Sequence, residues 1–181
     1  MKSLTLRTQL YLYATYVSGV ALFVLALQDV DLSNLPLLTV LCVLASLALI
    51  LKVEGSTNRS HYTFSFLVYG FTFAVYGAAE AILVIVVSNL VEWIWNKPAW
   101  YIQLFNTGSY IVVMAVAGLV ASWINPANSP NTWQTALAII VGMAIFNLLN
   151  HLMVAIVVWL ARGQNFKESG IFDFFPLMLD L

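Results

Sequence analysis

The stretch FSFLVYGFTFAVYGAAEAILVIVVSNLVEWIW, residues Phe64–Trp95, decides how the rest of the chain can be arranged. Its 32 residues carry two charges, Glu80 near the middle and Glu92 near the end. A single helix of this length would be about 48 Å long, well beyond the ~30 Å hydrocarbon core of a bilayer. Two full spans would need roughly 40 residues. The stretch therefore forms either one overlong, tilted helix or a hairpin of two short helices.

The composition places the chain in a membrane. Of its 181 residues, 62% are hydrophobic and 8% are charged, whereas soluble chains carry about 25% charged residues. The apolar runs are continuous rather than alternating, which favours helices over a β-barrel. The sequence therefore predicts an all-α polytopic membrane protein of about six transmembrane segments, with a short helical hairpin at residues 64–95.

The first helix is predicted at roughly Gln9–Gln28, because the apolar run that follows Lys2 and Arg7 is longer than that of a cleaved signal peptide. Small residues at i and i+4 on this helix, in the pairs Ala14/Ser18 and Thr15/Gly19, predict close approach of another helix. Further helices are expected from Pro36 to about Lys52, at about Leu104–Ile124 and at about Trp133–Leu160. Residues 1–163 then form the membrane domain, and residues 164–181 form a cytoplasmic or interfacial tail or the truncated start of a further segment.

The basic residues choose between one helix and a hairpin at 64–95, because Lys and Arg collect on the cytoplasmic side of membrane proteins. With a hairpin, all seven basic residues lie on the inside, and the outer loops hold Asp29 and Asp31. With a single span, four of the seven lie inside. The hairpin is therefore favoured, with its turn near Gly77–Glu80 and arms of about 15 residues each. This topology places both termini in the cytoplasm, and we expect a multi-pass protein of the bacterial inner membrane.

Glu80 is the strongest candidate for a functional residue, because a carboxylate at membrane depth is costly and often functional. It lies beside a stripe of small residues that would let helices pack closely, namely Gly70, Ala74, Gly77 and Ala78. Three interpretations stay open: a wet carboxylate that caps a helix N-terminus, a contact to a ligand or ion, and a pairing with a buried polar group. The hairpin topology moves Glu80 to the outer side, where it would line an outward-facing pocket.

Asn147, Asn150 and His151 are spaced at i, i+3 and i+4, so they share one helix face. They form either interhelical hydrogen bonds or the wall of a binding cavity. A lone histidine without a second one at ligand spacing predicts no metal site. Asn106, which is expected to open its helix as a cap or packing residue, completes the ligand-binding candidates.

The sequence carries no motif for catalysis or for nucleic-acid binding. It lacks a Ser/His/Asp order, an HExxH motif and a phosphate-binding loop, so we expect no enzyme activity and no cofactor. It also lacks a basic patch, so nucleic acid is not an expected partner. Cys42 is the single cysteine, which excludes an intrachain disulfide and predicts a packing role.

Two local features resemble a known family of membrane sensors. One is the polar loop that leads into the hairpin with its central Gly77-Ala78-Ala79. The other is the segment SNLVEWIWNKPAWYIQLFNTGSYIVVMAVAGLV, residues 88–120, which contains KPAWYIQLFN at Lys97–Asn106. Residues 60–125 resemble the N-terminal multi-helix (MASE-like) sensor regions that precede HD-GYP or GGDEF domains in bacterial signalling proteins. The layout is also similar to that of the S components of energy-coupling-factor transporters.

The resemblance implies a six-helix bundle with an outward-facing cavity for a small ligand. The first expectation is a ligand-sensing module of a bacterial signalling protein, without its output domain in this chain. Its partners would be the bilayer, a small-molecule ligand, and either a second copy in a homodimer or a signalling domain. One alternative is the substrate-binding subunit of a vitamin or small-molecule transporter, whose Ala-xxx-Ala docking pattern Ala14 and Ser18 only approximate. The other is a structural subunit of a larger membrane complex with a filled core.

Overall fold

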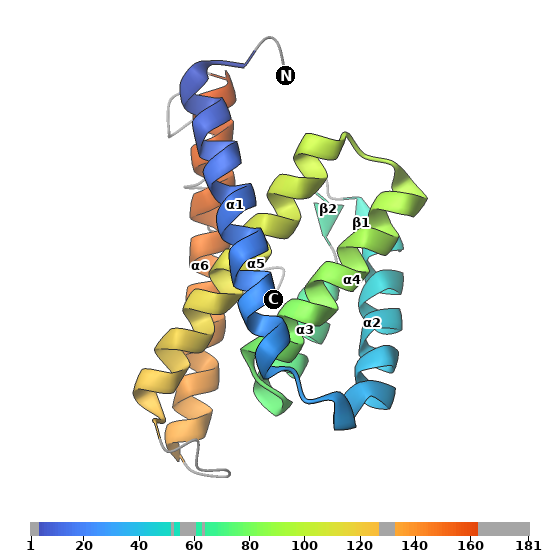
Figure 1. The fold of residues 1–181 in the computed structure, drawn as a ribbon, viewed down its shortest axis with the longest axis vertical. Helices are drawn as coiled ribbons and strands as arrows, with labels where there is room; N and C mark the ends of the chain where they lie inside the picture. Colours follow the sequence, from blue (N-terminus) through green and yellow to red (C-terminus); the bar gives the residue numbers. More distant parts are fainter. Residues whose placement is uncertain (1–3, 52, 55–60, 63, 127–132, 163–181) are drawn as a thin grey trace.

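The computed structural model describes residues 4–51, 53–54, 61–62, 64–126 and 133–162 (Figure 1). Within these residues the chain forms six α-helices, which confirms the all-α, polytopic prediction. They are α1 (Leu6–Asp29), α2 (Leu35–Ile50), α3 (Ser65–Val75), α4 (Ala78–Asn96), α5 (Trp100–Ile124) and α6 (Trp133–Arg162). A short 3-10 helix, η1 (Leu32–Asn34), precedes α2, and the two-residue strands β1 (Val53–Glu54) and β2 (His61–Tyr62) pair antiparallel between α2 and α3. The predicted tail, residues 164–181, lies outside the described residues.

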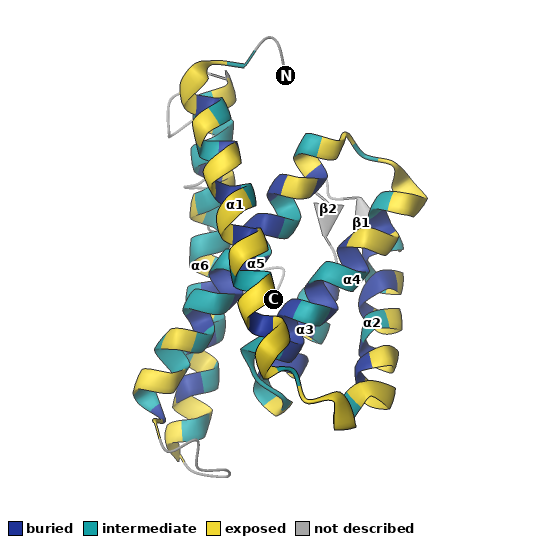
Figure 2. Ribbon diagram, viewed as in Figure 1, coloured by how far each residue is buried: buried dark blue, intermediate teal, exposed yellow. Residues whose placement is uncertain are grey.

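Five helical segments are long and apolar enough to cross a membrane, and α3 is the shorter apolar helix. Their outward faces expose many large apolar side chains, and the buried residues lie where helices face each other (Figure 2). On α1 alone, Leu10, Val17, Val20 and Val24 are each more than half exposed. A surface of this kind is stable in lipid rather than in water. The chain is therefore a multi-pass membrane protein.

The stretch Phe64–Trp95 forms two helices, as the distribution of basic residues predicts. Tyr76 and Gly77 make the turn, and the Gly77 N–H is bonded to the Phe73 carbonyl at 3.1 Å. Gly77 has φ 108° and ψ −175°, a conformation that glycine adopts without the steric cost of a side chain. The predicted equal arms are wrong, because α3 has 11 residues and α4 has 19. The first arm is the shorter one because the chain is still in β2 at Tyr62.

The start of α5 corrects a second prediction. Lys97 ends α4 in the left-handed conformation (φ 49°, ψ 44°), and Ala99 is the extended residue before α5. The break around Pro98 is therefore confined to three residues, and α5 begins at Trp100 rather than at Leu104. Asn106 consequently lies in the second turn of α5, and the expectation that it opens the helix is wrong.

The helices run alternately up and down, with α4 and α5 in the centre and α2 and α6 at opposite edges (Figure 1). α5 packs against α6, α1 and α4, while α4 also packs against α2 and α3. We call the end where α1 begins and α4 meets α5 the basic end, since it carries Arg7 and Lys97. The acidic end carries Asp29 and Asp31 and contains the α1–α2 connection and the α3–α4 turn.

Glycines bring α1 and α5 into close contact. A Cβ atom added to Gly19 would lie 2.8 Å from the Cα of Gly108, closer than real Cβ contacts allow. Thr15 shares this face of α1 and is buried, whereas Ala14 and Ser18 are exposed. Of the two small-residue pairs that the sequence offers, the Thr15/Gly19 pair is the one that faces another helix.

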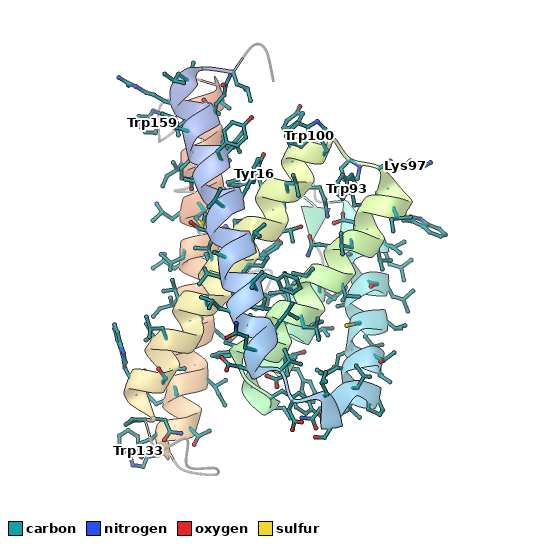
Figure 3. The ribbon with its side chains drawn as sticks, in the orientation of Figure 1. Tyr16, Trp93, Lys97, Trp100, Trp133 and Trp159 are labelled. Atoms are coloured by element: carbon teal, nitrogen blue, oxygen red, sulfur yellow. The ribbon has the colours of Figure 1, made fainter. Side chains whose placement is uncertain are left out.

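Aromatic side chains lie toward both ends of the helices (Figure 3). Trp93 and Trp100 flank Lys97 at the basic end, Trp159 lies near the same end on α6, and Trp133 lies at the acidic end. Tryptophan and tyrosine favour the headgroup level of a bilayer, where one side of the ring is apolar and the other is wet. The aromatic residues therefore indicate that the membrane plane is roughly perpendicular to the long axis of the molecule.

The arrangement predicts that the two ends react from opposite sides of the membrane. In a Cys42→Ala background, we expect Lys97→Cys and Ser33→Cys, both at exposed positions, to react with an impermeant maleimide from opposite faces of sealed vesicles. Val17→Cys, on the lipid-facing side of α1 with 69% exposure, is the unreactive control. Reaction of both end positions from one face would contradict the six-helix topology.

Candidate functional site

Five buried polar side chains meet near the basic end, and we call them the interior polar cluster. They are Tyr69 on α3, Ser88, Asn89 and Glu92 on α4, and Gln103 on α5. Each is at most 8% exposed. Polar groups buried between membrane helices are uncommon and costly unless hydrogen-bonded. The cluster is thus a part of the interior that apolar packing alone does not explain.

A chain of hydrogen bonds connects the members of the cluster. The hydroxyls of Tyr69 and Ser88 are 2.9 Å apart, and the Asn89 amide donates to the Tyr69 hydroxyl at 3.3 Å. The Gln103 amide donates to the backbone carbonyl of Asn89 at 2.8 Å. The same amide nitrogen lies 3.3 Å from both Asn89 Oδ1 and Glu92 Oε2. Among the described residues, no buried side-chain nitrogen or oxygen lacks a partner.

The cluster continues to α6 through Tyr110 on α5. The Tyr110 side chain is hydrogen-bonded to Asn150, and the Glu92 carboxylate is near enough to interact electrostatically with Tyr110 and Tyr69. The rings of Tyr69 and Tyr110 have centroids 6.1 Å apart, and Tyr110 stacks on Phe146 at 6.0 Å. The cluster and the side chains that extend it therefore come from four helices, α3, α4, α5 and α6.

The site forms because the spacing of the polar residues on α4 places them on one face of the helix. Ser88 and Glu92 are four residues apart and so lie one turn from each other, with Asn89 beside them. The short α4–α5 connection brings Gln103, in the first turn of α5, back against the last turns of α4. Chemically, such a site can accept hydrogen bonds at the carboxylate and donate them from the two amides.

Of the predicted ligand-binding residues, Asn150 joins the cluster and Glu80 lies elsewhere. Glu80 is at the acidic end, 5% exposed, and its Oε1 accepts the backbone N–H of Asp31 at 3.2 Å. Asn106 is half-buried, and its backbone carbonyl accepts the Ser109 hydroxyl at 2.9 Å. Asn147 and His151 are half-buried on α6.

The predicted packing residues lie at helix contacts or at the turn. A Cβ atom on Gly70 would stand 3.0 Å from the Met143 methyl group, and a Cβ atom on Gly118 would stand 2.5 Å from that of Ala78. Gly77 makes the α3–α4 turn, and Ala74 is half-buried on α3. The small residues of the hairpin therefore let α3 approach α6 and let α4 approach α5.

Sequence reasoning missed four of the five cluster residues and treated Glu92 only as a charge near the end of a span. One signal was available, because Ser88, Asn89 and Glu92 fall within five residues of an otherwise apolar helix. Tyr69 and Gln103 carry no such signal, since their partners lie 19 and 14 residues away in the chain.

Neither a metal site nor a known relative identifies the function. In the part of the chain that the structure describes, no group of three or more His, Cys, Asp or Glu residues could hold a metal ion. The chain matches no protein-family model, and comparisons with curated proteins and with solved structures find no similar protein. The interior polar cluster is therefore the basis for a functional proposal.

Proposed function

We propose that this chain is the ligand-sensing membrane module of a signalling protein, and that the interior polar cluster is the part that responds to the ligand. The observation that carries the proposal is the continuous hydrogen-bonded chain from Tyr69 through Asn89 to Gln103 and Glu92. Ionisable groups inside membrane helices are rare and usually functional. In this proposal the basic end faces the cytoplasm of a bacterial inner membrane, because Lys and Arg favour that side.

The cluster could respond by exchanging hydrogen-bond partners. A small ligand with N–H or O–H groups would compete with Gln103 for the Glu92 carboxylate, and the aromatic rings of Tyr69 and Tyr110 would favour a cationic or aromatic ligand. Because Gln103 is on α5 and Glu92 is on α4, such an exchange would change how these helices pack at the basic end. A ligand shifts this equilibrium only by the difference in its affinity for the two arrangements.

A structural role in a larger membrane complex is the second candidate. The observation that favours it is that the buried side-chain polar atoms of the described residues all have partners. A cluster that only fixes the register of packed helices would also have all its polar atoms paired. The two candidate functions differ in whether a small molecule binds to the cluster and changes the packing of the helices.

The test is a thermal-unfolding screen of the chain in lipid nanodiscs against small polar molecules, including amines, amino acids, nucleobases and vitamins. We expect at least one compound to stabilise the wild type, by about 2.7 kcal/mol at a concentration 100 times its Kd. Glu92→Gln should lose this effect. Gln134→Glu, at an exposed position at the start of α6, is the control that should keep it.

A stabilising compound should also alter hydrogen exchange in the α4–α5 connection, where α4 ends and α5 begins. Stabilisation of the wild type and Glu92→Gln to the same extent would contradict a role for the cluster. The absence of any stabilising compound would favour the structural candidate.

A further inference from the structure

At the acidic end, one glutamate joins two connections that are far apart in the sequence. Glu80 is in the first turn of α4, and Asp31 is in the connection between α1 and α2. The Glu80 Oε1 atom accepts the Asp31 backbone N–H at 3.2 Å. The Glu80 side chain is 5% exposed, so its carboxylate depends on protein groups in place of water.

The position of Glu80 on α4 also suits a carboxylate. The first turn of a helix presents N–H groups without helical partners and the positive end of the helix dipole, which favour a carboxylate at this position. The second oxygen, Oε2, lies over the turn, since a Cβ atom on Gly77 would stand 3.7 Å from it. Glu80 therefore has a favourable position on α4 that does not depend on Asp31.

The carboxylate of Asp31 is hydrogen-bonded within its own connection. Its Oδ1 accepts the Ser33 N–H at 2.9 Å, and its Oδ2 accepts the Asn34 amide at 3.2 Å. The hydrogen bonds from Ser33 hold the pKa of Asp31 below its ordinary value. Asp31 is exposed, so water and salt screen its repulsion of Glu80. The Asp31 N–H, by contrast, meets a buried carboxylate, where a charged hydrogen bond is strong.

The α1–α2 connection also covers apolar residues of the bundle. Val30, directly before Asp31, packs against the hydrophobic core, to which Ala26 near the end of α1 belongs. Among the described residues, the other titratable groups at this end are Asp29 on α1 and Tyr76 at the end of α3. Of the three carboxylates Asp29, Asp31 and Glu80, Glu80 is the buried one. The hydrogen bond to Asp31 therefore joins a buried carboxylate to the α1–α2 connection.

We propose that Glu80 is a charge-operated clasp. When Glu80 is ionised, it holds the α1–α2 connection against the α3–α4 turn. When the charge is lost, the connection is released and Val30 is uncovered. The clasp gives the acidic end a closed and an open form, and it does not depend on a ligand at the interior polar cluster.

The test is hydrogen exchange of residues 32–34, measured by mass spectrometry on the chain in nanodiscs at one neutral pH. Glu80→Gln keeps the shape of the side chain and an acceptor oxygen but removes the charge. We expect it to speed exchange in this segment about ten-fold, because a hydrogen bond to a charged group is stronger than one to a neutral group. Exchange in the middle of α5 should not change.

A matched pair at Asp31 separates the clasp from other effects of the substitution. Asp31→Pro removes the N–H donor, and the backbone tolerates it because Asp31 has φ −81° and Val30 has ψ 124°. Asp31→Ala removes the same carboxylate but keeps the donor. We expect exchange to be about ten-fold faster in Asp31→Pro than in Asp31→Ala.

Combining the variants gives the decisive comparison. Glu80→Gln should still accelerate exchange in the Asp31→Ala background and should have no further effect in the Asp31→Pro background. Equal acceleration in both backgrounds would overturn the clasp, as would unchanged exchange in the single Glu80→Gln variant. If Glu80→Gln does not fold, equal exchange in Asp31→Pro and Asp31→Ala overturns the proposal by itself.

Discussion

Gly19→Ala is expected to destabilise the chain by about 2–3 kcal/mol, because the added methyl group would be forced against backbone. An ideal Cβ atom at Gly19 lies 2.8 Å from the Cα of Gly108 and 3.4 Å from its carbonyl oxygen. Backbone atoms of two packed helices cannot rotate away, so α1 and α5 must separate along their whole contact. The measurement is the free energy of unfolding in mixed detergent micelles.

Gly70→Ala is the matched control for this prediction. Its Cβ atom would lie 3.0 Å from the Met143 methyl group, which is the end of a flexible side chain that can move aside. Both glycines are inside helices, so both substitutions gain the same helix propensity, roughly 0.5–1 kcal/mol. The difference between the two variants therefore isolates the packing cost. Equal stability of the two variants would show that α1 and α5 can adjust their spacing.

The sequence could predict a close helix approach on α1 but not the face that makes it. Thr15 with Gly19 and Ala14 with Ser18 are both small pairs at i and i+4, and they lie about 100° apart around the helix. The choice depends on Gly108 of α5, whose position is a property of the tertiary fold. Local patterns specify which contacts are sterically possible, and the partner helix selects among them.

The hairpin at Phe64–Trp95 was predictable because charge placement depends on the membrane and not on packing. Its unequal arms were not, since the length of α3 is limited by the paired strands before it and the turn at Gly77 after it. The buried polar residues show the same division. Glu80 was found as an isolated charge, whereas Gln103 gains its importance from Asn89 and Glu92 on a neighbouring helix.

Gln103→Leu is expected to destabilise the chain by about 2–4 kcal/mol, although interhelical hydrogen bonds in membranes average only about 0.6 kcal/mol. The larger effect is expected because the Gln103 amide is the hydrogen-bond donor to the Glu92 carboxylate and to the backbone and side-chain oxygens of Asn89. Leucine fills a similar volume but leaves these buried acceptors without that donor. Gln134→Leu, at an exposed position on α6, is the control and should change stability by no more than about 0.5 kcal/mol.

The origin of the stability lost in Gln103→Leu can be tested by also removing the Glu92 carboxylate. If the cost of Gln103→Leu comes from Glu92, then the double variant Gln103→Leu with Glu92→Leu should recover most of the lost stability, because well-packed apolar residues can replace a buried polar pair at little cost. A double variant that is as unstable as the sum of the two single variants would locate the cost in packing around α5 instead. Recovered stability together with lost ligand response would mean that Glu92 is retained for function, since the bundle would fold without it.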